Sequence, residues 1–444
     1  MKKLITTLTN IWKIEDLRNR IINTLLFLLI YRVGCHVVLP GVNPDALVTQ
    51  QKEGLLGILN MFSGGSFSRS AIFALGVMPY ISASIVVQLL GIAVPAFQKM
   101  QKEGESGRKK MNQITRYLTL AITIVQAIAY VKTQIEPGAK TIADPMFTIL
   151  SALVLTAGTL FVMWLGEKIT DKGIGNGVSL IIMAGIIAQL PAGIAQEWAS
   201  RMSGGGGIIP LLIEGIALFF VVIFTILIVQ GVRKIPVQYA KKIVGNKQVG
   251  GVRQYIPLKV NAAGVMPIIF AQAIMFLPMS LGQFFPTLQS DFLTALTDFT
   301  SIEYNVTFAI LIIAFTFFYT AIMVNPQQMS EDMKKNGGFV PGIKPGYDTN
   351  LFIDNVISRI TFPGAIFIAI IAILPSIASA AGVNNQFAHF YGGTSLLILV
   401  GVVLDTLQQI ESHLLMRHYD GLMKTGRVKG RSAVGVEGYD KSAI

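Results

Sequence analysis

The chain has 444 residues, of which 52% are hydrophobic and only 14% are charged, and its formal net charge is +12. This composition lies outside the usual range of soluble globular proteins and excludes that class. Because the chain has a single cysteine, Cys35, an internal disulfide is also excluded.

Apolar stretches of about 20 residues recur along the chain, and each is long enough to cross a hydrocarbon core of ~30 Å as a helix. Ten such stretches lie near 21–40, 71–94, 114–133, 146–166, 175–196, 208–231, 262–284, 306–325, 354–375 and 394–416. The alternating pattern of membrane strands is absent, so helices must satisfy the backbone in lipid. The sequence therefore predicts an all-α membrane protein with ten transmembrane helices.

The distribution of lysine and arginine predicts the orientation of these helices. The loop at 95–113 carries five basic residues, and the loop at 232–261 carries seven with no acidic residue. The loops at 285–305 and 376–393 carry none. Since basic loops stay on the cytoplasmic side, both termini are predicted to be cytoplasmic.

A glycine-rich stretch at 201–207 divides the ten predicted spans into two groups of five. An odd number of spans in each half gives the halves inverted topologies, an arrangement that places a path at their interface. We therefore expect an N-terminal half at 1–200, a flexible hinge at 201–207, a C-terminal half at 208–420 and a cytoplasmic tail at 421–444. A bundle without internal symmetry is the alternative.

A broken segment precedes the second predicted span. Residues 55–62 are apolar but too few to cross a membrane, and a stretch rich in glycine and serine follows at 63–70. Irregular backbone at membrane depth persists only where protein or a water-filled cavity surrounds it. The segment is therefore either an outer loop at the headgroups or a movable stopper inside a central cavity.

Few charged residues fall inside the predicted spans. Among them we single out Arg32, Glu214 and Asp405. Ion-coupled transporters use such groups as binding sites, but side chains that fix packing or extend toward an interface are the simpler interpretation.

The cytoplasmic loop at 232–261 has more basic residues than orientation requires. Its length and its glycine residues predict a hairpin-like projection that binds a polyanion, such as ribosomal RNA, or an acidic protein surface. A second loop, 326–350, contains a proline- and glycine-rich turn at 337–346.

Enzyme chemistry has little support in the sequence. No phosphate-binding loop ending in Gly-Lys-Ser/Thr is present, and the four histidines form no recognisable metal-ligand pattern. We predict no enzymatic activity and no cofactor.

Seven blocks in matching order resemble the SecY family of protein-translocase pore subunits. They are Asn-Met-Phe-Ser-Gly-Gly at 60–65 together with 73–85, then 102–108, Trp-Leu-Gly-Glu at 164–167, Gly-Ile-Gly-Asn-Gly at 173–177, Pro-Leu-Lys-Val-Asn at 257–261, Gly-Phe-Val-Pro-Gly-Ile at 338–343 and Tyr-Gly-Gly-Thr-Ser-Leu-Leu at 391–397. The resemblance implies two pseudo-symmetric five-helix halves around an hourglass pore in the bacterial cytoplasmic membrane. It implies a channel that translocates unfolded preproteins and releases membrane segments sideways into lipid.

The resemblance also assigns site residues to this chain. It implies a pore ring at Val77, Ile81, Ile182, Ile269 and Ile398. It implies a plug at Asn60, Met61, Phe62, Ser63, Gly64, Gly65, Ser66, Phe67, Ser68, Arg69 and Ser70. A lateral gate for signal sequences is implied between spans 2–3 and 7–8, with polar contacts at Ser82, Gln126 and Asn261.

The partners implied by the resemblance are the SecA motor ATPase and the ribosome on the cytoplasmic side, and SecE and a SecG-like subunit in the membrane. The expected docking residues are Arg233, Lys234, Lys241, Lys242, Lys247, Arg253 and Lys344. The chain departs from the family pattern at Val77, where isoleucine is commoner. It also departs at Lys344, where the family usually has arginine; lysine keeps the positive charge but lacks the planar guanidinium that makes bidentate hydrogen bonds. A secondary transporter with inverted five-span repeats is the rival hypothesis.

Overall fold

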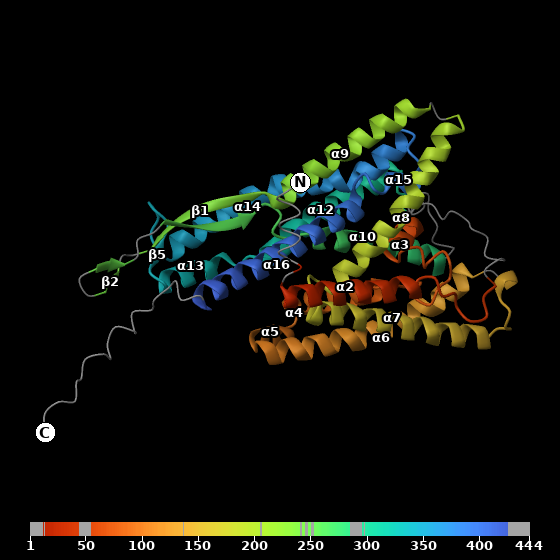
Figure 1. Ribbon diagram of the computed structural model, residues 1–444, viewed down its shortest axis with the longest axis horizontal. Helices are drawn as coiled ribbons and strands as arrows, with labels where there is room; N and C mark the ends of the chain where they lie inside the picture. Colours follow the sequence, from red (N-terminus) through yellow and green to blue (C-terminus); the bar gives the residue numbers. More distant parts are fainter. Residues whose placement is uncertain are drawn as a thin grey trace, which may run out of the picture.

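The computed structural model describes residues 12, 14–43, 55–135, 137–204, 207–239, 242–244, 247–249, 253–284, 295–296 and 298–424. Helices dominate it, with a three-stranded sheet and a two-stranded sheet at one end (Figure 1). The first half contains α2 (Glu15–Gly34), α3 (Leu55–Phe62), α4 (Met78–Ala93), α5 (Pro95–Lys102), α6 (Glu105–Gln134), the 3-10 turn η2 (Pro137–Ala139), α7 (Met146–Lys172) and α8 (Gly177–Met202). The second half contains α9 (Ile208–Gln230), α10 (Met266–Phe284), α12 (Ile302–Met323), α13 (Pro326–Lys335), α14 (Tyr347–Ala380), α15 (Asn385–Ala388) and α16 (Gly393–Lys424).

Each of the ten predicted spans overlaps one of these helices, but the count of ten spans stays a prediction. Within the described residues, seven helices are long and apolar enough to cross a membrane, namely α6, α7, α8, α9, α12, α14 and α16. The pair α4 and α5, bent by 100°, would make an eighth. Helix α2 includes five charged residues, which lowers its apolar character.

The bend between α4 and α5 follows from the sequence. Pro95 is the first residue of α5, and Val94 before it is extended, with φ −112° and ψ 119°. Proline disfavours a helical conformation in the preceding residue and lacks the amide hydrogen that would continue the helix. The chain therefore leaves the second predicted span sharply at this point.

Helix α8 joins the two groups of helices. It packs against α2, α3 and α7 of the first group and against α9, α15 and α16 of the second. In Figure 1, α2, α4, α6 and α7 lie together along one side, and α9, α12, α14 and α16 lie along the other. The residues at the centre therefore come from both halves of the chain.

The predicted hinge at 201–207 is too wide at its start. Helix α8 continues to Met202, and α9 begins at Ile208. Arg201 lies in the last turn of α8, where it pairs with Glu197 at 2.8 Å and also with Glu214 of α9. These ion pairs stabilise the last turn of α8, which occupies the first two positions of the expected hinge.

The predicted projection at 232–261 is confirmed as a hairpin. Strand β1 (Val232–Tyr239) pairs antiparallel with β4 (Arg253–Lys259), and β2 (Lys242–Val244) pairs with β3 (Lys247–Val249) at the tip. Strand β5 (Gly338–Phe339) adds to the other edge of β1, through Gln238 opposite Phe339. The loops at 232–261 and 326–350, which were predicted as separate features, therefore share one sheet in the order β4-β1-β5.

Candidate functional site

The five residues expected to form a ring belong to one hydrophobic cluster, which we call the central cluster. Val77, Ile182 and Ile398 are buried in it, and Ile81 and Ile269 pack against it half-buried. They come from the start of α4 and from α8, α10 and α16. Side chains separated by more than 300 positions in the chain therefore meet between the two halves.

The broken segment lies inside the protein and contacts the same cluster. Helix α3 ends at Phe62, as the sequence predicted, and turns follow from Ser63. Met61 and Phe62 are members of the central cluster, and Ser63 and Ser66 are 2% and 0% exposed. The stretch at 60–70, which we call the plug segment, is thus enclosed by helices rather than lying as an outer loop.

Side chains from three surrounding helices donate hydrogen bonds to main-chain carbonyls of the plug segment. Arg32 of α2 donates from Nη1 to the Gly64 carbonyl at 2.7 Å. Tyr130 of α6 donates to the Phe67 carbonyl at 2.6 Å, and Gln189 of α8 donates to the Asn60 carbonyl at 2.9 Å. The plug segment is therefore held mainly through its backbone.

Close packing of the plug segment depends on glycine. Gly64 and Gly65 have φ values of +65° and +86°, which are costly for residues with a side chain. On the facing helix, a Cβ added to Gly185 would lie 2.8 Å from the Phe62 carbonyl oxygen. A larger residue at Gly185 would therefore push the plug segment away from α8.

Ser66 fixes the fold of the plug segment from within. Its hydroxyl lies 2.7 Å from the Ser63 carbonyl and 2.8 Å from the Phe73 carbonyl. Ser68 donates its amide hydrogen to Asn60 Oδ1 at 3.1 Å. Serine side-chain and backbone groups therefore fix this turn from within.

No hydrogen bond of the described residues joins the three expected gate residues to one another. Ser82 donates to the Met78 carbonyl of its own helix at 3.1 Å, and Asn261 is buried with its Oδ1 unpartnered. Gln126 lies half-buried on α6. A polar contact that the sequence analysis missed joins α4 to α12, since Tyr319 donates to Gln88 Oε1 at 3.4 Å.

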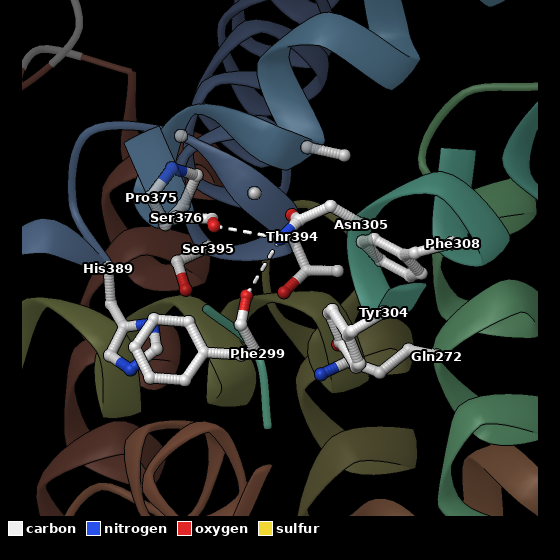
Figure 2. Close-up of a pocket in the computed structure, with 13 residues that line it drawn as sticks. Gln272, Phe299, Tyr304, Asn305, Phe308, Pro375, Ser376, His389, Thr394 and Ser395 are labelled. Atoms are coloured by element: carbon white, nitrogen blue, oxygen red, sulfur yellow. Dashed lines mark hydrogen bonds between the residues drawn. The ribbon is translucent and has the colours of Figure 1, made fainter. Parts of the chain in front are cut away.

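A second polar site lies within the C-terminal half (Figure 2). A cavity of about 40 Å³ between α10, α12, α14 and the start of α16 is lined by polar groups of Gln272, Asn305 and Thr394. Asn305 donates to Ser376 Oγ at 2.8 Å, whereas Nε2 of Gln272 is buried without a partner. A cavity of this size holds a buried water, which would satisfy such a group.

The basic surface expected to bind partners is only partly described. Arg233, Lys234 and Arg253 are exposed on β1 and β4, and Lys344 is exposed in the turn before α14. The Lys344 carbonyl accepts a hydrogen bond from Thr349 Oγ1 at 2.8 Å, which fixes that turn. Lys241 and the side chains of Lys242 and Lys247 lie outside the described residues.

Of the three charged residues singled out within the predicted spans, two have defined partners. Arg32 contacts the plug segment, and Glu214 pairs with Arg201, whereas Asp405 is exposed on α16. The sequence offered one signal for Arg32, namely a charge that a membrane span tolerates only with a partner. It offered none for Tyr130, Gln189 or Tyr319, because an aromatic or amide side chain on a span has many ordinary packing roles.

Comparison with known proteins gives a consistent result over almost the whole chain. A family model described as SecY matches residues 71–407. The protein translocase subunit SecY of Halalkalibacterium halodurans is 43% identical over 433 residues, which cover 94% of this chain and 99% of that protein. The protein of the same name from Chlamydia muridarum is 40% identical over 455 residues and covers 96% of this chain and 99% of its own length.

Solved structures share the fold at much lower identity. A protein-conducting channel superposes with a TM-score of 0.67 at 17% identity, with 95% of each chain covered. A SecY structure, whose title states that its plug domain stabilises the closed state, gives 0.63 at 17% identity with 95% of each chain covered. Sec61 in a canine ribosome-channel complex gives 0.63 at 16% identity, again with 95% of each chain covered.

Proposed function

The chain belongs to the SecY family, and we propose that it is the central subunit of a channel that moves unfolded preproteins across the bacterial cytoplasmic membrane. It also releases membrane segments laterally into lipid. The observation that carries the proposal is the meeting of five aliphatic side chains with a buried plug segment between two groups of helices. The chain is a multi-pass membrane protein of helices, with both termini on the cytoplasmic side.

The ring and the plug act together as a seal in this proposal. Val77, Ile81, Ile182, Ile269 and Ile398 form a narrow apolar waist that excludes water and ions by dewetting. Such side chains yield to an extended polypeptide, because dispersion contacts require no fixed partner. The plug segment covers the waist from the outer side at rest and moves away during translocation.

The gate opens between α4 and α6 on one side and α10 and α12 on the other. A hydrophobic signal segment replaces the weak polar contacts between these helices, such as the one between Gln88 and Tyr319. Ser82, Gln126 and Asn261 line the same opening. The signal segment then partitions into lipid, because burial of its apolar surface is favourable.

The hairpin formed by β1 and β4 is the cytoplasmic docking surface. Exposed Arg233, Lys234 and Arg253, together with Lys344 on the neighbouring turn, favour the anionic surfaces of ribosomal RNA or of the SecA motor. Pairing of β5 with β1 ties both loops into one unit. SecE and a SecG-like subunit are the expected membrane partners, and no cofactor or enzymatic step belongs to this chain.

Reconstitution of the chain with SecE and SecA in vesicles tests the proposal. We expect ATP-dependent uptake of a preprotein that reaches a protease-protected state, and loss of uptake when the signal segment is made polar. The rival hypothesis, a secondary transporter, predicts instead that a small solute accumulates while the preprotein stays outside. That result would refute the proposed function.

A further inference from the structure

The plug segment has two side-chain anchors, and they lie in different clusters. Met61 and Phe62 belong to the central cluster. Phe67 belongs to a separate cluster, formed with residues of α6 and α7 and with Leu39. One end of the plug segment therefore packs in the central cluster, and the other end packs against helix α6.

Tyr130 is the residue of α6 that contacts this second anchor. Its ring lies edge-on to Phe67, with the centroids 5.0 Å apart and an interplanar angle of 70°. Its hydroxyl donates to the Phe67 carbonyl at 2.6 Å and lies 3.2 Å from Ser70 Oγ. A single side chain thus holds both the carbonyl and the terminal turn of the plug segment.

Ser70 is held in an unfavourable backbone conformation at that turn. Its φ is +49°, and within the described part of the chain it is the one non-glycine residue with a positive φ. Such a conformation persists where surrounding contacts impose it, and it is common in switch regions. The contacts here are the Tyr130 hydroxyl and the Leu39 amide, which donates to the Ser70 carbonyl at 2.9 Å.

We propose that Tyr130 couples the lateral gate to the plug. The inference rests on the proposed function, in which α6 is a gate helix. When α6 moves away from α10 and α12, the Tyr130 hydroxyl leaves the Phe67 carbonyl, and the turn at Ser70 relaxes. Arg32, whose helix α2 is not part of the gate, holds Gly64 independently of that movement.

The chain contains its own reporter for plug displacement. Cys35, its single cysteine, is 0% exposed, and its Sγ lies 3.7 Å from the Ser63 carbonyl at the base of the plug segment. Departure of the plug segment uncovers this thiol. The rate at which a water-soluble maleimide labels Cys35 in the reconstituted complex therefore measures the fraction of displaced plug.

The first test compares two tyrosines of the same helix. Tyr130→Phe keeps the ring and removes the hydrogen bond, so resting Cys35 labelling should rise about two- to tenfold. Tyr117→Phe is the matched control, since Tyr117 is 73% exposed on α6 and should label like the parent protein. Equal labelling of both variants and the parent would overturn the assignment.

The second test separates coupling from simple stabilisation by a double-mutant cycle. Tyr319→Phe removes the hydrogen bond to Gln88 and loosens the gate, so it should raise labelling in the parent protein. The same substitution should have little further effect in the Tyr130→Phe background, because the transmitting bond is already absent. In an Arg32→Lys background its effect should persist in full.

Two outcomes of the cycle would overturn the proposal. One is independent, multiplicative effects of Tyr319→Phe and Tyr130→Phe on the labelling rate. The other is no effect of Tyr319→Phe in the parent protein. Failure of the proposed function is distinguishable from both, because it would show as an unmodified complex that takes up no preprotein.

Discussion

Loss of Arg201 should destabilise the junction of the two halves more than loss of any exposed arginine. The guanidinium lies 2.8 Å from Glu197 Oε1 and 2.8 Å from the Gly382 carbonyl, and it also pairs with Glu214. The side chains of Arg201, Glu197 and Glu214 are 13%, 1% and 10% exposed. Arg201 is therefore the counter-ion of two buried carboxylates, and it links α8 to α9 and to the loop after α14.

Arg201→Gln leaves both carboxylates buried without a counter-charge. Removal of one partner from a buried ion pair typically lowers the free energy of unfolding by about 3–5 kcal/mol, and we expect a loss of that size here. Arg116→Gln is the matched control. Arg116 and Glu167 join α6 to α7 at 3.0 and 2.6 Å, but they are 50% and 27% exposed, so the loss should not exceed about 1 kcal/mol.

Thermal unfolding of the detergent-solubilised complex, followed by tryptophan fluorescence, measures the difference. Adding Glu214→Gln to Arg201→Gln should recover part of the loss, because it removes one of the unpaired charges. If Arg201→Gln lowers stability no more than Arg116→Gln does, the argument that this buried ion cluster fixes the junction is wrong.

Three further predictions concern the pore and the docking surface. Replacing Ile182 and Ile398 together by glycine should raise resting ion conductance in planar bilayers, because the waist becomes wider and less apolar and therefore wets. Ile187→Gly, on the exposed face of α8, should leave the conductance unchanged, and the reverse pattern would mean that the ring lies elsewhere. Gly185→Val should displace the plug by overpacking, with resting Cys35 labelling raised about five- to hundredfold, and parental labelling would contradict the close approach. Lys234→Glu should weaken ribosome binding and lower its salt slope by about 0.7–0.9 or more, whereas an unchanged slope would exclude this contact.

The sequence predicted correctly those secondary-structure elements that depend on local composition and length. Ten apolar stretches each fall on a helix, and the length of 55–62 predicted a short helix that ends before a turn. A hairpin at 232–261 followed from the length of that loop and the glycines in its middle. The number of membrane spans was harder to predict, because α2 includes Arg18, Arg20 and Arg32. With these charges, its sequence fits both a membrane span and an amphipathic helix.

Contacts between distant parts of the chain could not be read from local pattern. Nothing in the sequence of residues 338–339 predicts that they form the third strand of the sheet, because a stretch of two residues is too short to show a periodic pattern. Glycines at 204–207 predicted flexibility, whereas the pairing of Arg201 with Glu214 depends on a fold that brings α8 and α9 together. The ring residues were named through family resemblance, because an isoleucine in a membrane span looks the same whether it faces lipid or a pore.

The direction of the hydrogen bonds around the plug segment predicts which substitutions the proposed seal tolerates. Arg32, Tyr130 and Gln189 all donate to carbonyl oxygens, and every residue supplies a carbonyl whatever its side chain. Most side-chain substitutions in the plug segment therefore leave these bonds intact. The exceptions are Gly64, where a Cβ would lie 3.2 Å from the Gly185 Cα, and Gly65, whose positive φ disfavours a side chain. Substitution of a donor removes a bond that no other residue replaces. Closure should accordingly be far more sensitive to the three donors than to the exposed Arg69 of the plug segment itself.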